Sequence, residues 1–434
     1  MADIKILIVQ ICVILLATYL VGWLLGKVGQ PQVVGEMVAG ILLGPSLLGW
    51  IAPDLSAAIF PASSLGPLNL LSQLGLLLFM FMIGLELDTK KLRQLGHVAV
   101  VISHTSIIVP FAMGALLAMY LYPRVTDNSL PFTGFVLFMG AAMSVTAFPV
   151  LARILGERNL LGTGLGTLTI ACAAVDDVTA WCLLAVIIAL VRSEVNQLPL
   201  WQMLPGLVAY LAVMLFVLQP LMKKLVARQD DAKRTEKVIA VVLVCMLASS
   251  WATEWLGIHA LFGAFFAGVI MPKEHGFAED VRRRFRVPVV VLLIPLFFAF
   301  TGLRTSIGLI SGSGMIVYCG LVFAVAVVGK FGGSTIAARV MGRPWREASA
   351  IGILMNTRGL IELVILNIGL DIGVLNRPLF SIMVLMAVGT TLMTTPVLSW
   401  IHSDRRTRFT VAVRKRDFET PSYGPMISRE ASQL

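Results

Sequence analysis

Thirteen apolar stretches dominate this sequence and leave very few folds open to it. About 20 predominantly apolar residues in a helix span the hydrocarbon core of a bilayer. Because lipid offers the backbone no hydrogen-bond partners, a spanning segment must be a helix or part of a closed barrel. We therefore predict an all-α polytopic membrane protein with about 13 transmembrane helices. These lie near 4–25, 32–50, 67–87, 97–122, 132–155, 163–192, 200–222, 236–256, 258–272, 287–303, 313–338, 346–370 and 378–402.

The composition supports a place in the lipid bilayer. Hydrophobic residues make up 58% of the chain and charged residues 13%, whereas soluble domains are about half apolar and a quarter charged. The first stretch carries only Lys5, is too long for a signal peptide and lacks a cleavage site, so we expect a retained helix. The five cysteines lie in apolar stretches without paired spacing, which predicts neither disulfides nor a metal site. We expect no cofactor.

Lysine and arginine residues predict the orientation. If the chain crosses the membrane thirteen times, 27 of the 34 basic residues fall on one side, 5 on the other and 2 inside helices. Basic residues collect in cytoplasmic loops, so we expect the N-terminus outside and the C-terminus in the cytoplasm. The net charge of +10 is explained in this way and does not indicate a nucleic-acid partner.

Two parts of the chain repeat each other. Leu78-Phe79 precedes Gly84-Leu85-Glu86 with the same spacing that Leu296-Phe297 has before Gly302-Leu303-Arg304. The glycines and proline of 35–45 likewise match those of 263–272. A shift of seven helices reverses the direction of crossing, which predicts an inverted repeat of the kind found in secondary transporters. Generic close packing of glycines is the alternative.

The fifth and twelfth helices are equivalent in this repeat, and both contain residues that interrupt a helix. The interruptions are Ser144–Pro149 and Asn356–Gly359. Proline removes a backbone donor and glycine weakens a helix, so we predict two broken helices that cross near the midplane. An ordinary proline kink is the alternative for either helix alone. We expect the polar residues at and beside the breaks to support them, namely Ser144, Thr146, Asn356, Thr357, Arg358 and Glu362.

Five ionisable residues occupy helix interiors, where an unpaired charge costs several kcal/mol. Asp176 and Asp177 are adjacent on the sixth helix and point about 100° apart, so we expect them to have different roles. Lys330 is the expected partner of Asp176. Arg358 and Glu362 are spaced i, i+4 and can form an ion pair, which makes a purely structural role the simpler interpretation for them.

A buried carboxylate that must hold either a proton or a metal cation makes two ions compete for one site. Competition at a site exposed alternately to the two sides is antiport. The sequence therefore predicts a cation/proton-binding site for Na⁺ or K⁺ and H⁺ at Asp177, with Asp176 beside it. Mutual neutralisation of the buried charges is the alternative.

At these residues the chain resembles the monovalent cation/proton antiporter-2 family of the sodium/proton exchanger superfamily, near its plant-like branch and bacterial relatives. The resemblance covers about 1–402. It is carried by the segments Gly35–Pro45, Gly84–Asp88, Ala174–Asp177, Gly329-Lys330 and Met355–Leu363.

The resemblance implies a sodium/proton antiporter-like fold and a homodimer. Each protomer would have a dimerisation domain and a mobile core of helices four to six and eleven to thirteen, moving by an elevator-type mechanism. Asp177 would match the essential cation and proton carboxylate, Asp176 its partner paired to Lys330, and Thr146 a residue of the first break. The presence of two aspartates implies electrogenic exchange.

The expected organisation is a membrane domain, 1–402, followed by a short basic cytoplasmic tail, 403–434. The domain comprises a first repeat at about 1–192, a linker helix at about 200–222 and a second repeat at about 236–402. The lack of a transit segment favours a bacterial inner membrane.

Three other functions fit parts of the pattern. A sodium-coupled organic anion symporter could use the same inverted repeat, but the acidic pair favours a cation site. An intramembrane aspartyl protease needs aspartates that converge from separate helices, and no Gly-x-Gly-Asp segment occurs. A channel needs a continuous polar pore, whereas the polar residues here cluster at the midplane.

Overall fold

The computed structural model describes residues 4–86, 97–126, 131–160, 163–194, 200–227, 236–256, 259–273, 276–310 and 312–401, and every regular element in these ranges is helical. The first half holds α1 (Ile4–Lys27), α2 (Gln32–Leu43), α3 (Leu48–Ile51), α4 (Pro53–Ile59), η1 (Ala62–Ser64), α5 (Leu65–Glu86), α7 (His97–Val125), α8 (Phe132–Ser144), α9 (Phe148–Glu157) and α10 (Gly164–Glu194). The predicted tail, 403–434, lies outside the described residues.

A connecting segment joins the halves and consists of α11 (Leu200–Ala212), η2 (Val213–Leu218) and α12 (Gln219–Ala227). The second half holds α13 (Glu236–Trp255), α14 (Ala260–Ile270), α15 (Phe277–Val287), η5 (Pro288–Leu293), α16 (Ile294–Arg304), η6 (Ile307–Ile310), α17 (Ser313–Val327), η7 (Val328–Gly332), α18 (Gly333–Val340), α19 (Trp345–Met355), α20 (Leu360–Asp371) and α21 (Arg377–Ile401). The all-α membrane architecture predicted from the sequence is thus confirmed.

The number of spans in the described residues is close to the expected thirteen. Ten helical segments are long and apolar enough to cross a membrane, and the pair α19 and α20, bent by 43°, makes up to eleven. The two remaining predicted spans contain the shorter apolar helices α8 and α14. Thirteen crossings therefore remain a prediction.

The two halves pack in matching order. α1 lies against α2 as α13 lies against α14, and α7 against α8 as α18 against α19. α2 also packs against α16, and α5 against α14. Since the sequence repeat equates α2 with α14 and α5 with α16, these two contacts are equivalent under the repeat.

Glycines of the repeat lie at these equivalent contacts. A Cβ atom at Gly40 or at Gly302 would run into the backbone of the other helix at the α2–α16 contact. A Cβ atom at Gly84 or at Gly268 would do the same at the α5–α14 contact. The matched glycines therefore permit two close helix crossings, one for each pair.

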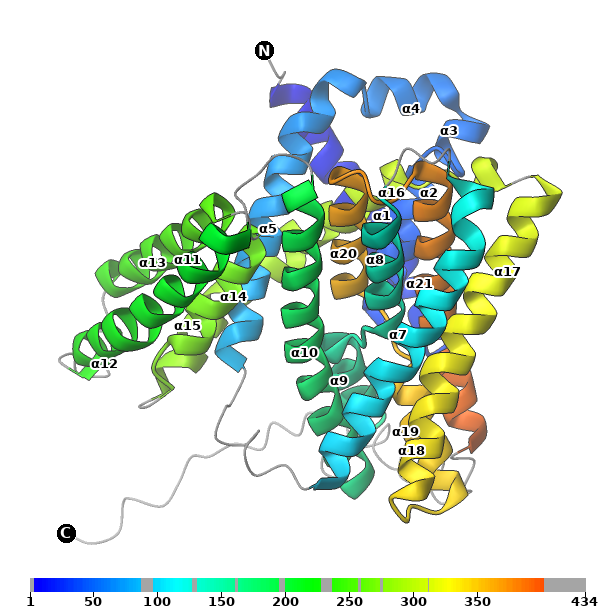
Figure 1. Cartoon of the computed structure of the whole chain (residues 1–434). Coiled ribbons are helices and arrows are strands. Elements are labelled where there is room, and N and C mark those ends of the chain that lie inside the picture. Colours follow the sequence, from blue (N-terminus) through cyan, green and yellow to red (C-terminus); the bar gives the residue numbers. More distant parts are fainter. Residues whose placement is uncertain are drawn as a thin grey trace, which may run out of the picture.

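The helices form two groups beside each other (Figure 1). The green helices α11 to α15 lie on one side, and α7 to α10 with α17 to α21 lie on the other. α5 packs against both α14 and α16. We refer to α7–α10 and α17–α21 as the core group, and to the remaining helices as the scaffold group.

Both predicted breaks are present within the core group. Residues 145–147 are extended between α8 and α9, and α9 begins with Phe148-Pro149. Pro149 has no N–H to bond the carbonyl of Val145, which is one reason why the helix cannot continue through this point. Residues 356–359 separate α19 from α20 in the same way.

Candidate cation and proton site

The two breaks meet and share backbone hydrogen bonds. The N–H of Ala147 donates to the carbonyl of Thr357 at 2.9 Å. The hydroxyl of Thr146 donates to the carbonyl of Met355, the last residue of α19, at 3.0 Å. A Cβ at Gly359 would lie 2.6 Å from a methyl group of Val150, so glycine is needed here for the close approach. The crossing therefore brings four half-helix ends to one place.

Asp176 lies next to this crossing and is saturated with hydrogen bonds. Ser103 and Ser106, both on α7, donate to its Oδ1 at 2.6 Å and 3.0 Å, and Ser106 also reaches Oδ2 at 2.8 Å. Thr146 donates to Oδ2 at 2.7 Å. Lys330 forms an ion pair with the same Oδ2 at 2.8 Å. Asp176 thus has donors from α7, the first break and the second repeat.

Lys330 is fully buried in the π-helical turn η7. Such turns insert an extra residue into a helix and are frequent at functional sites. Besides Asp176, its Nζ donates to the carbonyl of Ser106 at 2.9 Å and to the carbonyl of Ser144. Lys330 therefore neutralises Asp176 and binds the C-terminal end of α8 at the same time.

Arg358 performs a similar function on the other side of that helix end. Its guanidinium donates to the carbonyls of Ala142 and Met143 at 2.8 Å and 2.7 Å, and pairs with Glu362 at 2.5 Å. The last carbonyls of a helix have no partner within the helix and carry partial negative charge. Two cations of the second repeat thus cap the end of α8.

Asp177 has a different environment from its neighbour. Its side chain is only 3% exposed, and neither carboxylate oxygen has a hydrogen-bond partner among the described residues. The backbone N–H of Phe148, the first residue of α9, interacts favourably with this carboxylate. A buried carboxylate with unused acceptor capacity at a positive helix end is suited to bind a proton or a small cation.

The other predicted residues lie in the same cluster. Ser144 donates its hydroxyl to the carbonyl of Ala141 within its own helix, so its contribution to the site is its backbone carbonyl. Thr357 likewise contributes its carbonyl, and its buried hydroxyl has no partner in the described part of the chain. Asn356 is fully buried, and its side-chain nitrogen donates a long hydrogen bond of 3.9 Å to the sulfur of Met393, while its amide oxygen has no partner among the described residues.

Sequence reasoning missed three residues of this cluster. Ser103 and Ser106 bind Asp176, and Thr391 of α21 bonds both the N–H and the carbonyl of Arg358, at 3.0 Å and 2.7 Å. Hydroxyls spaced i, i+3 on an apolar helix are the only signal that could have indicated the two serines. Outside this cluster, Glu36 of α2 is a further buried carboxylic acid, 3% exposed.

Two halves with matching helix contacts, broken helices that meet, and buried charges at their crossing are features of secondary transporters. Residues 13–402 match the family described as sodium/hydrogen exchanger, transmembrane. The chain belongs to this family.

Several relatives are similar along nearly the whole chain. The Na⁺/H⁺ antiporter NhaS4 of Synechocystis is 40% identical over 91% of this chain and 97% of its own length. Cation/H⁺ antiporter 17 of Arabidopsis thaliana is 42% identical over 91% of this chain, and K⁺/H⁺ antiporter 1 of Saccharomyces cerevisiae 33% over the same share. The chain spans about half the length of these two, with 48% and 46% covered.

A solved structure supports the fold. The sodium proton antiporter MjNhaP1 of Methanocaldococcus jannaschii aligns with a TM-score of 0.63, covering 90% of this chain and 94% of that one. The identity is 14%, so this similarity concerns the fold alone. It confirms the predicted antiporter-like architecture.

Proposed function

We propose that the protein exchanges a monovalent cation, Na⁺ or K⁺, for protons, and that both ions bind in turn at Asp177. The observation that carries this proposal is the contrast between the two aspartates. Asp176 is occupied by three hydroxyls and Lys330, whereas Asp177 is equally buried with free acceptor oxygens. The names of the relatives, which are all cation/H⁺ antiporters, support the same exchange.

The chemistry of Asp177 explains why the two ions exclude each other. An ionised carboxylate in a low-dielectric site is costly when it is unpaired, so it is stabilised by a proton or by a metal cation. One carboxylate cannot hold both, because protonation removes the charge that attracts the cation. Carbonyl oxygens and hydroxyls at the crossing are hard ligands suited to Na⁺ or K⁺, and Thr357 has an unused hydroxyl there.

Asp176 and Lys330 set the electrostatic background of this exchange. Before a cation arrives, their ion pair neutralises the charge of Asp176. If the arriving cation displaces Lys330 from Asp176 and the lysine releases its proton, each cycle moves net charge. We therefore propose electrogenic exchange.

The helix grouping supports an elevator-type mechanism. The core group, α7–α10 and α17–α21, carries all the site residues and would move as a unit against the scaffold group. We propose that two copies of the chain form a homodimer through their scaffold groups. We further propose that the protein lies in a bacterial inner membrane, with its N-terminus outside the cell and its C-terminus in the cytoplasm. The repeat boundaries at about 1–192 and 236–402, with the linker at about 200–222, belong to the same proposal.

A sodium-coupled organic anion symporter is the second candidate, and the site favours it less. Both cationic side chains at the crossing are already bound to carboxylates and to backbone carbonyls of α8. An organic anion would have no free positive side chain to bind among these residues, whereas a cation has Asp177.

The proposal is tested in proteoliposomes that contain a pH-sensitive dye, with Na⁺, Li⁺ or K⁺ added in turn at clamped membrane voltage. We expect cation-driven proton movement in the unmodified protein and at least a ~100-fold loss in Asp177→Asn, because an amide can neither release a proton nor attract the cation by charge. Asp54→Asn, at an exposed position in α4, is the matched control and should retain exchange.

Two results would contradict the proposal. Cation-driven proton movement that survives in Asp177→Asn would show that another group carries the exchange. An organic anion that moves with Na⁺ in the unmodified protein, without any proton movement, would favour the symporter instead.

A further inference from the structure

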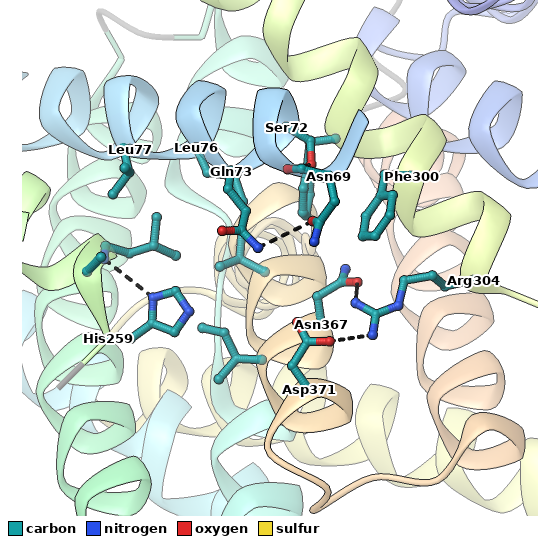
Figure 2. A pocket seen from close by; sticks show the side chains of 15 residues that line it. Asn69, Ser72, Gln73, Leu76, Leu77, His259, Phe300, Arg304, Asn367 and Asp371 are labelled. Atoms are coloured by element: carbon teal, nitrogen blue, oxygen red, sulfur yellow. Dashed lines mark hydrogen bonds and ion pairs between the residues drawn. The ribbon is translucent and has the colours of Figure 1, made fainter. Parts of the chain in front are cut away.

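A polar contact outside the binding site joins the two groups of helices at one end of the molecule. Arg304 is the last residue of the scaffold helix α16, and Asn367 and Asp371 lie in the last two turns of the core helix α20. Arg304 donates to the side-chain oxygen of Asn367 at 3.0 Å and forms an ion pair with Asp371 (Figure 2). Asn367 donates in turn to the hydroxyl of Thr301 at 2.9 Å. We refer to these four residues as the α16–α20 latch.

The latch combines a buried hydrogen bond with a partly exposed ion pair. The Arg304 side chain is 23% exposed and that of Asp371 is 50% exposed, whereas Asn367 is almost completely buried at 7%. The two donor groups of one guanidinium reach side chains one helical turn apart, which fixes both the position and the rotation of α20 relative to α16. A second bond at this end, from the N–H of Ser306 to the hydroxyl of Ser381 in α21, is 3.0 Å long.

The latch borders a pocket that lies between the two groups. Asn69 and Gln73 of α5 and His259 beside α14 line the pocket from the scaffold, and Val364 and Asn367 line it from the core. Arg304 and Asp371 lie at its edge, with Arg304 pointing from α16 towards the end of α20 (Figure 2). α20 leads from this pocket to Glu362 and the crossing of the broken helices.

The latch belongs to this end of the molecule and is not a consequence of the repeat. The repeat places Glu86 at the position that corresponds to Arg304, so the equivalent helix end carries the opposite charge. At the opposite end, Arg153 of α9 donates to the amide oxygen of Gln32 at 3.1 Å, and Gln30 donates to the carbonyl of Leu392 at 3.0 Å. Arg153 also interacts electrostatically with Glu36 of α2, so different residues join the core and scaffold groups at the two ends of the molecule.

We propose that the α16–α20 latch closes the path between this end of the molecule and Asp177, and that it must open in every transport cycle. Arg304 is then a positioning residue that sets the balance between the two access states. This inference depends on the proposed relative motion of the core and scaffold groups. It does not depend on which ion Asp177 carries.

The main test prevents the latch from opening. A double variant, Arg304→Cys with Asp371→Cys, is bridged by a short bifunctional methanethiosulfonate reagent that a reductant removes. We expect the bridged protein in proteoliposomes to lose at least ~90% of cation-driven proton movement, and the reductant to restore it. Arg343→Cys with Glu347→Cys is the matched control, because this i, i+4 pair of 3.2 Å joins residues within the core group. Its bridge should leave exchange unchanged.

A second test removes the latch and measures access instead of transport. Arg304→Gln is combined with Ser72→Cys, which places a thiol in the pocket on α5, and labelling with a membrane-impermeant maleimide is followed by mass. We expect labelling of this thiol to rise at least ~3-fold over the Ser72→Cys protein with Arg304 intact. Arg343→Gln should not change it.

The outcomes separate the latch from the proposed function. Full exchange in the bridged Arg304→Cys/Asp371→Cys protein would overturn the latch and leave cation/proton exchange intact. If the unmodified protein shows no exchange, the labelling test still decides, and unchanged labelling in Arg304→Gln would reject the latch. Increased labelling without exchange would support the latch and contradict only the proposed ions.

Discussion

The two broken helices occupy equivalent places in the repeat but contribute opposite groups to the site. The first break, 145–147, contains no charged residue, and its helix α8 presents carbonyl oxygens. The second break contains Arg358, followed by Glu362 in the first turn of α20. The remaining charges are divided in the same way, since both aspartates lie in the first repeat and Lys330 in the second.

This division explains how a symmetric fold produces an asymmetric site. Lys330 and Arg358 neutralise the negative end of α8 and one carboxylate each. After this compensation Asp177 remains as the buried carboxylate without a paired cation or a hydrogen bond in the described residues. The repeat thus supplies the crossing, and the uneven distribution of charge determines that the crossing attracts a cation.

Among the substitutions at the crossing, replacement of Arg358 should lower the stability of the protein most. Arg358→Met leaves Glu362 buried without its partner and the carbonyls of Ala142 and Met143 without donors. Breaking a buried ion pair on one side costs about 3–5 kcal/mol. We expect a correspondingly lower apparent melting temperature in detergent, measured by intrinsic fluorescence.

Two comparisons test the cause of this loss. Arg343→Met disrupts the partly exposed pair with Glu347 and should cost less than ~1 kcal/mol. Arg358→Met combined with Glu362→Met removes both charges and should be more stable than Arg358→Met alone, because no buried charge is left unpaired. If the double variant is the less stable of the two, the ion pair is not the source of the stabilisation.

The sequence predicted the residues of the second break better than their partners. The spacing of Arg358 and Glu362 predicts an ion pair on any helix, because residues i and i+4 share a face. That Arg358 also caps α8 could not be predicted, since Ala142 and Met143 lie more than 200 positions away and contribute only backbone oxygens. Backbone carbonyls are the same in every residue, so no residue type indicates which of them will be free.

The first repeat shows the same limit for side chains. The apolar pattern predicts the α7 helix, and its pairing with α10 follows only from the packed fold. Ser103 and Ser106 therefore looked like ordinary small polar residues, and nothing in the sequence indicated that both hydroxyls bind Asp176. The thirteen crossings, by contrast, depend on length and composition, which are local properties.

Replacing Lys330 should have a smaller effect on stability than replacing Arg358, and a larger effect on coupling. In Lys330→Met, Asp176 keeps the donors Ser103, Ser106 and Thr146 and can take up a proton. We expect exchange to persist at a reduced rate and to lose its dependence on membrane voltage. Proteoliposome assays at several clamped voltages measure this dependence, and an unchanged voltage response would exclude Lys330 from the coupling step.

The smallest expected effects on stability come from two substitutions at the first break, Thr146→Val and Ser144→Ala. Comparing them distinguishes the contribution of a side-chain hydroxyl from that of a backbone carbonyl. Thr146→Val removes the one hydroxyl proton that Asp176 and the carbonyl of Met355 share, and an unsatisfied buried acceptor costs about 1–3 kcal/mol. Ser144→Ala removes a bond within α8 but keeps the carbonyl that holds Lys330, so we expect less than ~1 kcal/mol and unchanged exchange. Melting followed by intrinsic fluorescence measures the stability of both variants, and proteoliposome assays measure their cation-driven proton movement. A greater loss in Ser144→Ala would mean that the serine hydroxyl acts on the ions directly.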